Sequence, residues 1–517
     1  MAFALSILPI LLILVLMAGF NLSAEKAGLI GYLACVLIGV IFFGVTVPIL
    51  SYGHLRGLWF AIDVLLIIWS AYLFYLVIDE AGIVQILERR LPEIAPSQGM
   101  QAFALGWIFA SFLQGVGGFG VPVAVIAPIL ITLGFSPLQA VLIPSVGHGW
   151  GVTFGSLGSS FRALLAISGH PIFPLNVITA VMLACSCVLS GWICLLLVNG
   201  WRELRRSFGW VTSTGLVMGL FLILGVWWGV WNLGTFLGAL AGLLWFLFWV
   251  RYFYNHQRID RNTLRELGAA FAGFGVLIVV IFAVNFVPLL KTLLEQVKFT
   301  LMLPPLETGQ NRLNLAPHLI KAGKAGEIAI FSHPGVVLFY AIVLIVFWYA
   351  YQGRLERDSI GRVGRKLLRG LIPTTIGVWA MVTMSSLMEM SGMTDAIAQG
   401  LSVWFAKFYP LAALLIGAVG AFMTGSNTNS NVLFAILQMQ TARILGYPTA
   451  LILAAQTAAA SIGSTLAPAK IIVGTSTTGL RGKEGDILRR LFPIVLFQIL
   501  FLGLIVYGML GLERMLP

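Results

Sequence analysis

Long apolar blocks dominate this sequence of 517 residues and constrain its fold more than any other feature. Each block runs for about 18 to 25 residues, the length that an α-helix needs to cross the roughly 30 Å hydrocarbon core of a bilayer. Only 10% of the residues are charged, whereas a water-soluble protein carries roughly 25%. We therefore expect an all-α polytopic membrane protein without a separate soluble domain.

Twelve of these blocks predict transmembrane helices. They are residues 3–22, 28–50, 58–78, 137–160, 174–199, 211–229, 232–250, 268–290, 334–352, 371–391, 448–470 and 491–513. The first block has neither a basic n-region nor an obvious small-residue cleavage site, so it reads as a membrane helix and not as a signal peptide. Two further apolar stretches, 100–133 and 409–445, are interrupted by glycine or polar runs.

The basic residues indicate how the chain is threaded. A net charge of +12 could favour nucleic-acid binding, but the Lys and Arg residues form short clusters between apolar blocks, as in cytoplasmic loops. If both interrupted stretches are re-entrant hairpins, 20 of the 31 basic residues lie in loops on one face, which predicts that this face is cytoplasmic and both termini are extracellular or periplasmic. Those loops are residues 21–27, 79–98, 200–210, 251–267, 353–370 and 480–490.

An internal repeat supports the two hairpins. Phe112-Leu113-Gln114-Gly115 recurs as Phe422-Met423-Thr424-Gly425, and an offset of 310 to 312 residues persists downstream. The predicted threading inverts one copy relative to the other, and inverted repeats with broken helices are the architecture of secondary transporters. We expect N-terminal scaffold helices (1–57), a first repeat (58–199, hairpin 100–133), central scaffold helices (200–370) and a second repeat (371–513, hairpin 409–445).

The first hairpin tip is rich in glycine. Gln114 is followed by Gly115, Gly117, Gly118 and Gly120, and then by Val121-Pro122. Non-helical backbone survives at membrane depth only where it is buried in protein or lines a polar cavity, and a helix beginning at the proline would direct N–H groups at an anion. The alternative is that these glycines only permit close helix packing.

The second hairpin tip, residues 424–431, is a polar run within an apolar region. Seven of its eight residues carry hydroxyl or amide side chains, which require hydrogen-bond partners such as a substrate carboxylate or a cation. The alternative is a solvated surface turn. Residues 145–151 with Ser156, and residues 461–465, resemble unwound helix segments within blocks 137–160 and 448–470 and are expected to face the tips. The candidate binding residues in these segments are Thr424, Gly425, Ser426, Asn427, Thr428, Asn429, Asn431, Ser156, Ser464 and Thr465.

Few ionisable residues lie at membrane depth, and each is a functional hypothesis there. His148 stands between glycines and titrates near neutral pH, so it is a candidate for proton coupling, as is Glu389. Lys470 could attract an anion or extend to the membrane surface, and Asp63 is expected at the interface. We find no enzyme, nucleotide-binding or metal motif, and therefore expect no cofactor and no metal site.

Both tips resemble the lactate permease family. Residues 112–124, which include Gly118-Phe119-Gly120-Val121-Pro122, are similar to its FLEGAAGFGAPVA signature, and residues 422–435 to its FLTGSDTSSNALFAAL. Ser391-Gly392-Met393 and the segment 479–484 also match the family. Ser426-Asn427-Thr428 is similar to the binding triplet of the wider ion-transporter superfamily. The resemblance implies an elevator-type carrier that takes up lactate, or glycolate, together with a proton.

This chain departs from the family at charged positions. Gln114 and Asn427 replace a glutamate and an aspartate, Ser464 replaces a lysine, and Lys470 follows six residues later. Because amides hold no transferable proton, His148 and Glu389 are our substitutes for the lost carboxylates. The expected partners are a small organic anion, H⁺ (or Na⁺), the lipid bilayer and, as one option, a second copy in a homodimer.

Alternative functions remain open from the sequence. One is a Na⁺-coupled carrier or a carrier of another small anion, such as a hydroxy or sulfur acid. The other is a membrane subunit or membrane enzyme that transports nothing. An enzyme would need a reactive cluster at membrane depth, and Asp63, His148 and Glu389 are scattered along the sequence.

Overall fold

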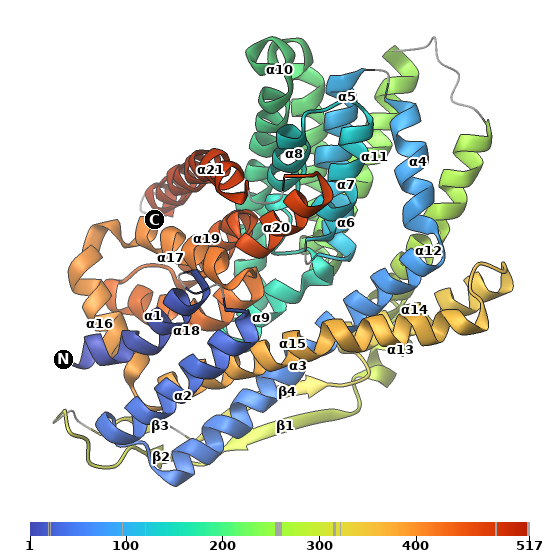
Figure 1. Ribbon diagram of the computed structural model, residues 1–517. Helices are drawn as coiled ribbons and strands as arrows, with labels where there is room; N and C mark the ends of the chain where they lie inside the picture. Colours follow the sequence, from blue (N-terminus) through green and yellow to red (C-terminus); the bar gives the residue numbers. More distant parts are fainter. Residues whose placement is uncertain are drawn as a thin grey trace.

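The computed structural model describes residues 1–18, 20, 22–95, 97–118, 120–253, 261–313, 317–320, 322–480 and 483–513. Phe119 of the first tip and Arg481 and Gly482 of the segment 479–484 lie outside these residues. In the described part, eleven helical segments are long and apolar enough to cross a bilayer. The chain is therefore a mostly helical, multi-pass membrane protein (Figure 1).

Two sets of helices lie outside the repeated segments. One set precedes the first segment, and the other lies between the two segments. The N-terminal pair is α1 (Ala2–Ala18) and α2 (Ala24–Phe42). The central set is the 3-10 turn η3 (Trp231–Leu233), α11 (Gly234–Phe253), α12 (Arg261–Phe286), α13 (Pro288–Leu294) and α14 (Pro334–Tyr351).

The first repeated segment begins with the long helix α3 (Val47–Glu80) and the amphipathic helix α4 (Ile83–Ile94). Its interrupted stretch consists of α5 (Gln98–Phe103), a π-helical turn η1 (Ala104–Phe109), α6 (Ala110–Val116) and α7 (Val121–Thr132). The segment continues with α8 (Pro137–Gly149), the 3-10 turn η2 (Ser156–Gly158), α9 (Ser159–Ser168) and α10 (Ile172–Trp227).

The second repeated segment has the same order of elements. It consists of α15 (Arg357–Met390), α16 (Met393–Phe405), the 3-10 turn η4 (Ala406–Phe408), α17 (Tyr409–Thr424), α18 (Asn427–Leu445), α19 (Thr449–Gly463), the 3-10 turn η5 (Ser464–Leu466), α20 (Pro468–Thr477) and α21 (Glu484–Glu513). Each segment thus has a long helix, a shorter helix, two helices joined at a tip, and a helix that breaks before a short one.

The predicted blocks 137–160 and 448–470 are interrupted at the segments predicted to be unwound, although residues 145–149 and 461–463 are still helical. The first ends as helix at Gly149 and resumes at η2 and α9, and the second ends at Gly463 and resumes at η5 and α20. The blocks 174–199 and 211–229 lie within α10, which is kinked where Asn199 and Gly200 leave helical geometry. The polar and glycine residues near these block ends mark the breaks, because they favour non-helical backbone.

The loop between α13 and α14 contains two small antiparallel β-ladders that the sequence pattern did not predict. β1 (Lys298–Leu303) pairs with β4 (Gly323–Ala329), and β2 (Leu306–Glu307) pairs with β3 (Leu319–Ile320). Both β1 and β4 lie against α3. The charges and glycines of these strands conceal the alternation of apolar and polar residues by which a strand is recognised.

The two repeated segments interlock. The long helices α3 and α15 pack against each other, α9 packs against α18, and α7 packs against α20 (Figure 1). The short helix after each break therefore contacts the hairpin of the opposite segment. This crossing brings residues that are about 300 positions apart in the sequence into one central region.

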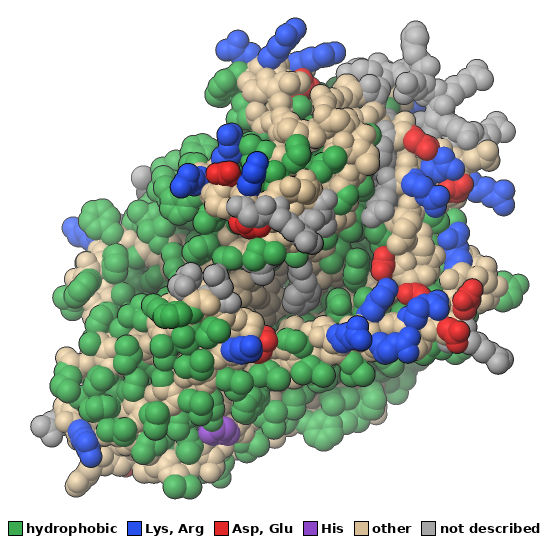
Figure 2. Space-filling model, in the orientation of Figure 1, with side chains coloured by type: hydrophobic (Ala, Val, Ile, Leu, Met, Phe, Trp, Pro, Cys, Tyr) green, Lys and Arg blue, Asp and Glu red, His purple; other side chains and the backbone are tan. Residues whose placement is uncertain are grey.

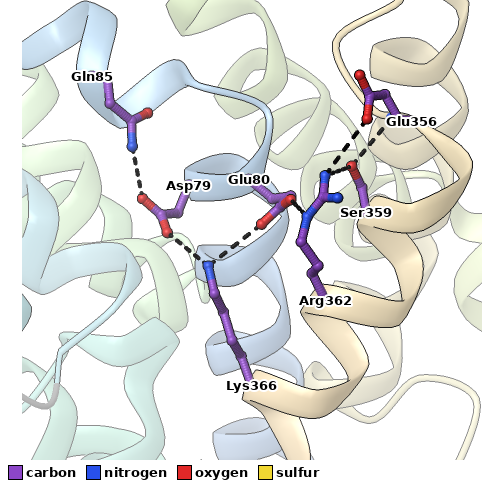
Figure 3. A network of polar contacts seen from close by, with 7 residues as sticks. All are labelled: Asp79, Glu80, Gln85, Glu356, Ser359, Arg362 and Lys366. Atoms are coloured by element: carbon purple, nitrogen blue, oxygen red, sulfur yellow. Dashed lines mark hydrogen bonds and ion pairs between the residues drawn. The ribbon is translucent and has the colours of Figure 1, made fainter.

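Ion pairs connect the ends of the two long helices (Figure 3). The Glu80 carboxylate on α3 accepts from Arg362 Nε at 2.5 Å and from Lys366 Nζ at 3.4 Å on α15, and Asp79 lies 3.8 Å from the same lysine. The end of α3 is thereby held to the first part of α15. Exposed pairs of this kind contribute only about 0–1 kcal/mol each, so the apolar packing between the two helices provides most of the stability.

The surface agrees with a protein that lies in lipid. Hydrophobic side chains cover much of the face shown in Figure 2, and Lys and Arg gather mainly at its top and along its right side, with a smaller group at the upper left. At the top and on the right they lie over the turn within α10, the ends of α4 and α12, and the start of α15. Exposed side chains on the long helices include Leu216, Val279, Phe347 and Leu504, as expected for helices whose outer faces contact acyl chains.

Candidate functional site

The second polar run forms a sharp break between two helices. α17 ends at Thr424, Gly425 has a φ of +73° that favours glycine, and α18 begins at Asn427. The Ser426 hydroxyl caps α18 by accepting the Asn429 backbone N–H at 3.4 Å. The run is therefore an interruption between two packed helices, and most of its polar side chains are buried. This placement differs from the alternative of a solvated surface turn.

The asparagines of this tip are bonded inside the protein. Asn427 is only 1% exposed, and its Nδ2 donates to Thr153 Oγ1 at 3.0 Å. Asn431 Nδ2 donates to the Thr457 hydroxyl and to the Ser160 carbonyl, both at 2.9 Å. The amides thus join the second tip to the break after α8, to α9 and to α19.

The first tip is also closely packed against its neighbours. α6 ends at Val116 and α7 begins at Val121, and the φ angles of Gly118 (+63°) and Gly120 (+86°) lie in the region that residues with a Cβ atom rarely adopt. A Cβ atom on Gly118 would lie 1.8 Å from the Ser156 hydroxyl, and one on Gly115 would lie 2.8 Å from the Phe236 backbone. These glycines therefore allow close packing at the tip, and their role in a binding site stays a prediction.

The break after α8 has unusual backbone geometry. Ser156 (φ +46°), Leu157 (φ +54°) and Gly158 (φ +80°) are three consecutive residues in the left-handed region. Each such non-glycine residue costs about 1–3 kcal/mol, and strain of this kind is concentrated at functional sites. The Ser461 hydroxyl of α19 accepts the N–H groups of Val152 (3.0 Å) and Thr153 (3.2 Å), which satisfies part of the unwound backbone.

A cavity of about 300 Å³ lies beside the second tip and contains a lysine. That volume is at the lower end of the roughly 300–1,000 Å³ range typical of small-molecule sites. Lys470 of α20 is 9% exposed, so it is buried and does not extend to the membrane surface. The cavity is lined by Glu25, Ile68, Pro373, Thr374, Gly377, Val378, Thr424, Gly425, Ser426, Thr428, Asn429, Lys470 and Val473.

The structure divides the predicted binding residues into three neighbouring groups. Gln114, Gly118 and Ser156 lie together at the first tip. Asn427, Thr428 and Asn431 contact α9 and α19, with Thr428 Oγ1 lying 3.0 Å from Ser160 Oγ. Ser464 accepts a hydrogen bond of 2.9 Å from Lys470 Nζ. The remaining predicted residues lie beside these groups: Gly115, Gly117 and Gly120 in the first tip, Thr424, Gly425, Ser426 and Asn429 at the cavity, and Thr465 against Gly149.

Three of the predicted binding residues have a buried amide oxygen without a hydrogen-bond partner among the described residues. These atoms are Gln114 Oε1, Asn427 Oδ1 and Asn431 Oδ1, and a fourth such oxygen, Gln440 Oε1, lies outside the predicted site. Burial of an unsatisfied polar atom costs about 1–3 kcal/mol, so each of the three oxygens in the predicted site is a candidate ligand-binding atom. The described residues contain no group of three or more His, Cys, Asp or Glu side chains that could hold a metal ion.

The two predicted proton-coupling residues lie apart. His148 on α8 is fully buried, its Nδ1 donates to the Pro144 carbonyl at 2.6 Å, and its Nε2 has no partner among the described residues. Glu389 on α15 lies 2.7 Å from Arg56 of α3, and its side chain is 27% exposed. The described residues show no contact between His148 and Glu389.

Asp63 lies near the middle of α3, because this helix begins eleven residues before the predicted block 58–78. The residue is 3% exposed, and its carboxylate contacts Arg162 of α9 and His333, which precedes α14. Nothing in the sequence links these residues, which are 99 and 270 positions away. The other missed contact residues are Thr153, Ser160, Thr457 and Ser461, small hydroxyl side chains that also occur in ordinary membrane helices.

Comparison with known proteins places the whole chain in one family. Residues 2–510 match the family model described as L-lactate permease. An L-lactate permease of Streptococcus iniae is 29% identical over 458 residues, covering 85% of this chain and 91% of the relative. A glycolate permease of Escherichia coli (strain K12) is 24% identical over 527 residues, covering 94% and 91%.

A search of solved structures gives a more distant likeness. The YdaH transporter of Alcanivorax borkumensis aligns with a TM-score of 0.47 and 12% identity, covering 86% of this chain and 85% of that one. The family match extends over nearly the entire sequence and includes both tips, both breaks and the cavity. This chain therefore belongs to the L-lactate permease family.

Proposed function

We propose that this protein is a secondary carrier that takes up a small monocarboxylate of the lactate or glycolate type across the bacterial cytoplasmic membrane, coupled to H⁺. Relatives named L-lactate permease and glycolate permease support this substrate class. Hydroxyl and amide groups beside a buried cation suit an anion that also carries a hydroxyl group. The absence of a nucleotide-binding motif favours an ion gradient as the energy source.

The proposal depends on one observation, the buried ammonium group of Lys470 that has no carboxylate partner among the described residues. This ammonium group has three donors, and Ser464 accepts one of them. Among the described residues, no carboxylate forms an ion pair with it, although Glu25 lines the same cavity. A buried charge without a counter-ion is costly, and a substrate carboxylate in the cavity would supply the missing negative charge.

The position of the cavity suits movement of the hairpins as a unit. One wall comes from α2, α3 and α15, and the other comes from the second tip and α20. Sliding of the tips and short helices along the long helices would carry a bound anion between the two sides. We propose this elevator motion for the re-entrant hairpins at 100–133 and 409–445 and the short helices of the repeats 58–199 and 371–513. The long helices α3 and α15 stay in place with the scaffold helices within 1–57 and 200–370, and both termini lie outside. A homodimer stays a prediction.

The coupling ion has two candidates. For H⁺, His148 and Glu389 stay predictions. For Na⁺, the three buried amide oxygens of Gln114, Asn427 and Asn431 favour a second candidate function, because uncharged oxygen atoms without donors are suitable ligands for a hard cation. Sodium-dependent uptake that ignores a pH gradient would support this second function.

Counterflow in proteoliposomes tests the proposed function. Vesicles that contain the purified protein and are preloaded with unlabelled L-lactate are expected to accumulate external radiolabelled L-lactate transiently, because a carrier exchanges its substrate without net flux. Glycolate and sulfur-acid analogues, added as competitors, define the substrate class. A membrane subunit, a membrane enzyme or a channel would give no counterflow, and that result would contradict the proposal.

Asn427→Asp is expected to make transport strongly dependent on pH. Asn427 Nδ2 lies 3.4 Å from the Thr457 carbonyl oxygen, so a carboxylate at this place would face another acceptor, whereas a protonated Asp would restore a donor. Leaving a buried polar group unpaired costs about 1–3 kcal/mol, or roughly 5- to 150-fold. Uptake should therefore fall about tenfold or more at pH 8 and recover in part at pH 5. A pH profile equal to that of the wild type would contradict this assignment.

A further inference from the structure

Asp63 is the centre of a buried network near the middle of the long apolar helix α3. Its Oδ1 lies 2.6 Å from Arg162 Nη2 and 2.9 Å from His333 Nε2, and its Oδ2 lies 2.9 Å from Arg162 Nε. The guanidinium thus binds both carboxylate oxygens, the strongest and most directional form of this pair. Ionisable groups inside membrane proteins are expensive to bury and are usually functional.

His333 is a neutral donor in this network. Its Nδ1 accepts the Gly335 backbone N–H at 3.2 Å, so its proton is on Nε2 and points at Asp63. The start of α14 is packed tightly against α3, since a Cβ atom on Gly335 would lie 2.4 Å from the Leu66 carbonyl. His333 and Asp63 therefore belong to one rigid part of the protein, the part formed by α3 and α14.

Arg162 belongs to the mobile part that our proposed function requires. It lies on α9, two residues after Ser160, whose carbonyl and hydroxyl contact Asn431 and Thr428 of the second tip. On its other side α9 packs against α3. The Asp63–Arg162 pair is thus a direct ionic connection between the helix that touches the binding tip and the helix that would stay fixed.

The two short helices after the breaks differ in one respect. Both carry a basic residue near their start, Arg162 on α9 and Lys470 on α20. Arg162 has a carboxylate, whereas no carboxylate pairs with Lys470 among the described residues. Ile68, five residues after Asp63 on α3, lines the cavity that contains Lys470. The protein therefore neutralises the charge of Arg162, whereas the charge of Lys470 nearby is available to a substrate.

The other charged groups around α3 are engaged elsewhere. Arg56 pairs with Glu389 of α15, Asp79 and Glu80 contact Arg362 and Lys366 of α15, and Arg90 of α4 pairs with Glu93 and Glu266. On the β-ladder, Lys298 pairs with Glu327. Of the described titratable groups, the charged Arg162 and the neutral His333 are the ones in contact with Asp63.

We propose that Asp63 is the proton-coupling carboxylate of this carrier, and that its pair with Arg162 is a lock that opens on protonation. This inference rests on the proposed carrier function and adds the coupling site to it. A proton from the outer side binds one carboxylate oxygen and forms an O–H bond, so the ionic attraction to Arg162 is lost. The α9 helix is then free to move with the tips and the bound anion. Release of the same proton on the inner side restores the carboxylate, which pairs with Arg162 again when α9 returns.

The test separates exchange from accumulation. Wild-type proteoliposomes, made alkaline inside by one pH unit, are expected to concentrate radiolabelled L-lactate up to about tenfold, the limit for one proton per anion. Asp63→Asn keeps a polar side chain of the same shape but binds no proton. This variant should retain a counterflow rate within about threefold of the wild-type rate. The pH gradient should produce no accumulation, so that the inside-to-outside ratio of L-lactate stays at about one. Glu80→Gln, a carboxylate on the same helix that also pairs with an arginine, is the matched control and should respond to the gradient like the wild type.

Each result decides the proposal. If Asp63→Asn accumulates lactate as the wild type does, the proposed lock is wrong and the carrier function still stands. The same conclusion follows if uptake by the wild type responds to a sodium gradient and not to a pH gradient. Wild type without counterflow overturns both. If Asp63→Asn loses counterflow too, His333→Ala decides. Removing this donor to the carboxylate should raise the pH of half-maximal uptake, and an unshifted pH profile overturns the proposal.

Discussion

Lys470→Met is expected to lower the catalytic efficiency of lactate uptake by about 10- to 100-fold, mainly through a higher KM. A hydrogen bond to a charged group contributes about 1.5–3 kcal/mol, and the methionine side chain has a similar length but neither the charge nor a donor. The ammonium lies in the cavity beside the second tip, so its loss removes the expected partner of the substrate carboxylate. Initial uptake rates in proteoliposomes over a range of L-lactate concentrations measure this effect.

A matched variant separates the site from general electrostatics. Lys407 lies in the exposed turn η4, away from the cavity residues, and Lys407→Met should change the KM by less than about twofold, because surface charges contribute little. An unchanged KM in Lys470→Met would mean that the anion binds elsewhere. A purified variant that elutes as a monodisperse peak like the wild type confirms that the fold is intact.

Gly118→Ala is expected to reduce transport by tenfold or more and to destabilise the protein by about 2–4 kcal/mol. Two costs combine at this position. The φ angle of +63° disfavours any residue with a Cβ atom, and the new methyl group would lie 1.8 Å from Ser156 Oγ in a fully packed tip. The Ser156 side chain would have to rotate in a backbone that is itself left-handed. Thermal unfolding and uptake rate are the two measurements.

Gly134→Ala isolates the backbone cost. Gly134 also has a positive φ (+87°), but nothing lies within 4 Å of a Cβ atom placed there. This variant should lose only the roughly 1–2 kcal/mol of the left-handed conformation and should keep its transport rate. Equal losses of transport in the two variants would show that conformation, and not contact between the tip and Ser156, explains the effect.

The sequence predicted the elements of this fold better than their contacts. Glycine and polar runs inside apolar blocks are rare, so the residues themselves indicate the breaks at 117–120 and 425–426. The membrane class followed from block length alone. The β-ladder was not predicted, because a two-stranded ladder with glycines and charges lacks the alternation that identifies a strand. The ends of the helices around the breaks were also misplaced, since an apolar residue there fits either conformation.

The contacts of the candidate site could be predicted only in part from the sequence, for a related reason. Asn427 and Asn431 stand out in an apolar region, and the structure places both at the centre of the contacts between α18, α9 and α19. Asp63 did not stand out, because its position near the end of a predicted block has an ordinary explanation. Its environment depends on Arg162 and His333, which the fold brings from distant positions. A single sequence contains no information that relates these three residues.

The crossed packing of α7 with α20 and of α9 with α18 has a consequence for biosynthesis. More than 300 residues separate α7 from α20, so the first hairpin enters the membrane long before its partner helix has been translated. Until then, its glycine-rich tip must be shielded from lipid by neighbours from the first half of the chain, such as Phe236 on α11. Maturation of the transport pathway thus waits for the last helices, and a ribosome that stalls before α20 leaves a protein that is inserted but incomplete.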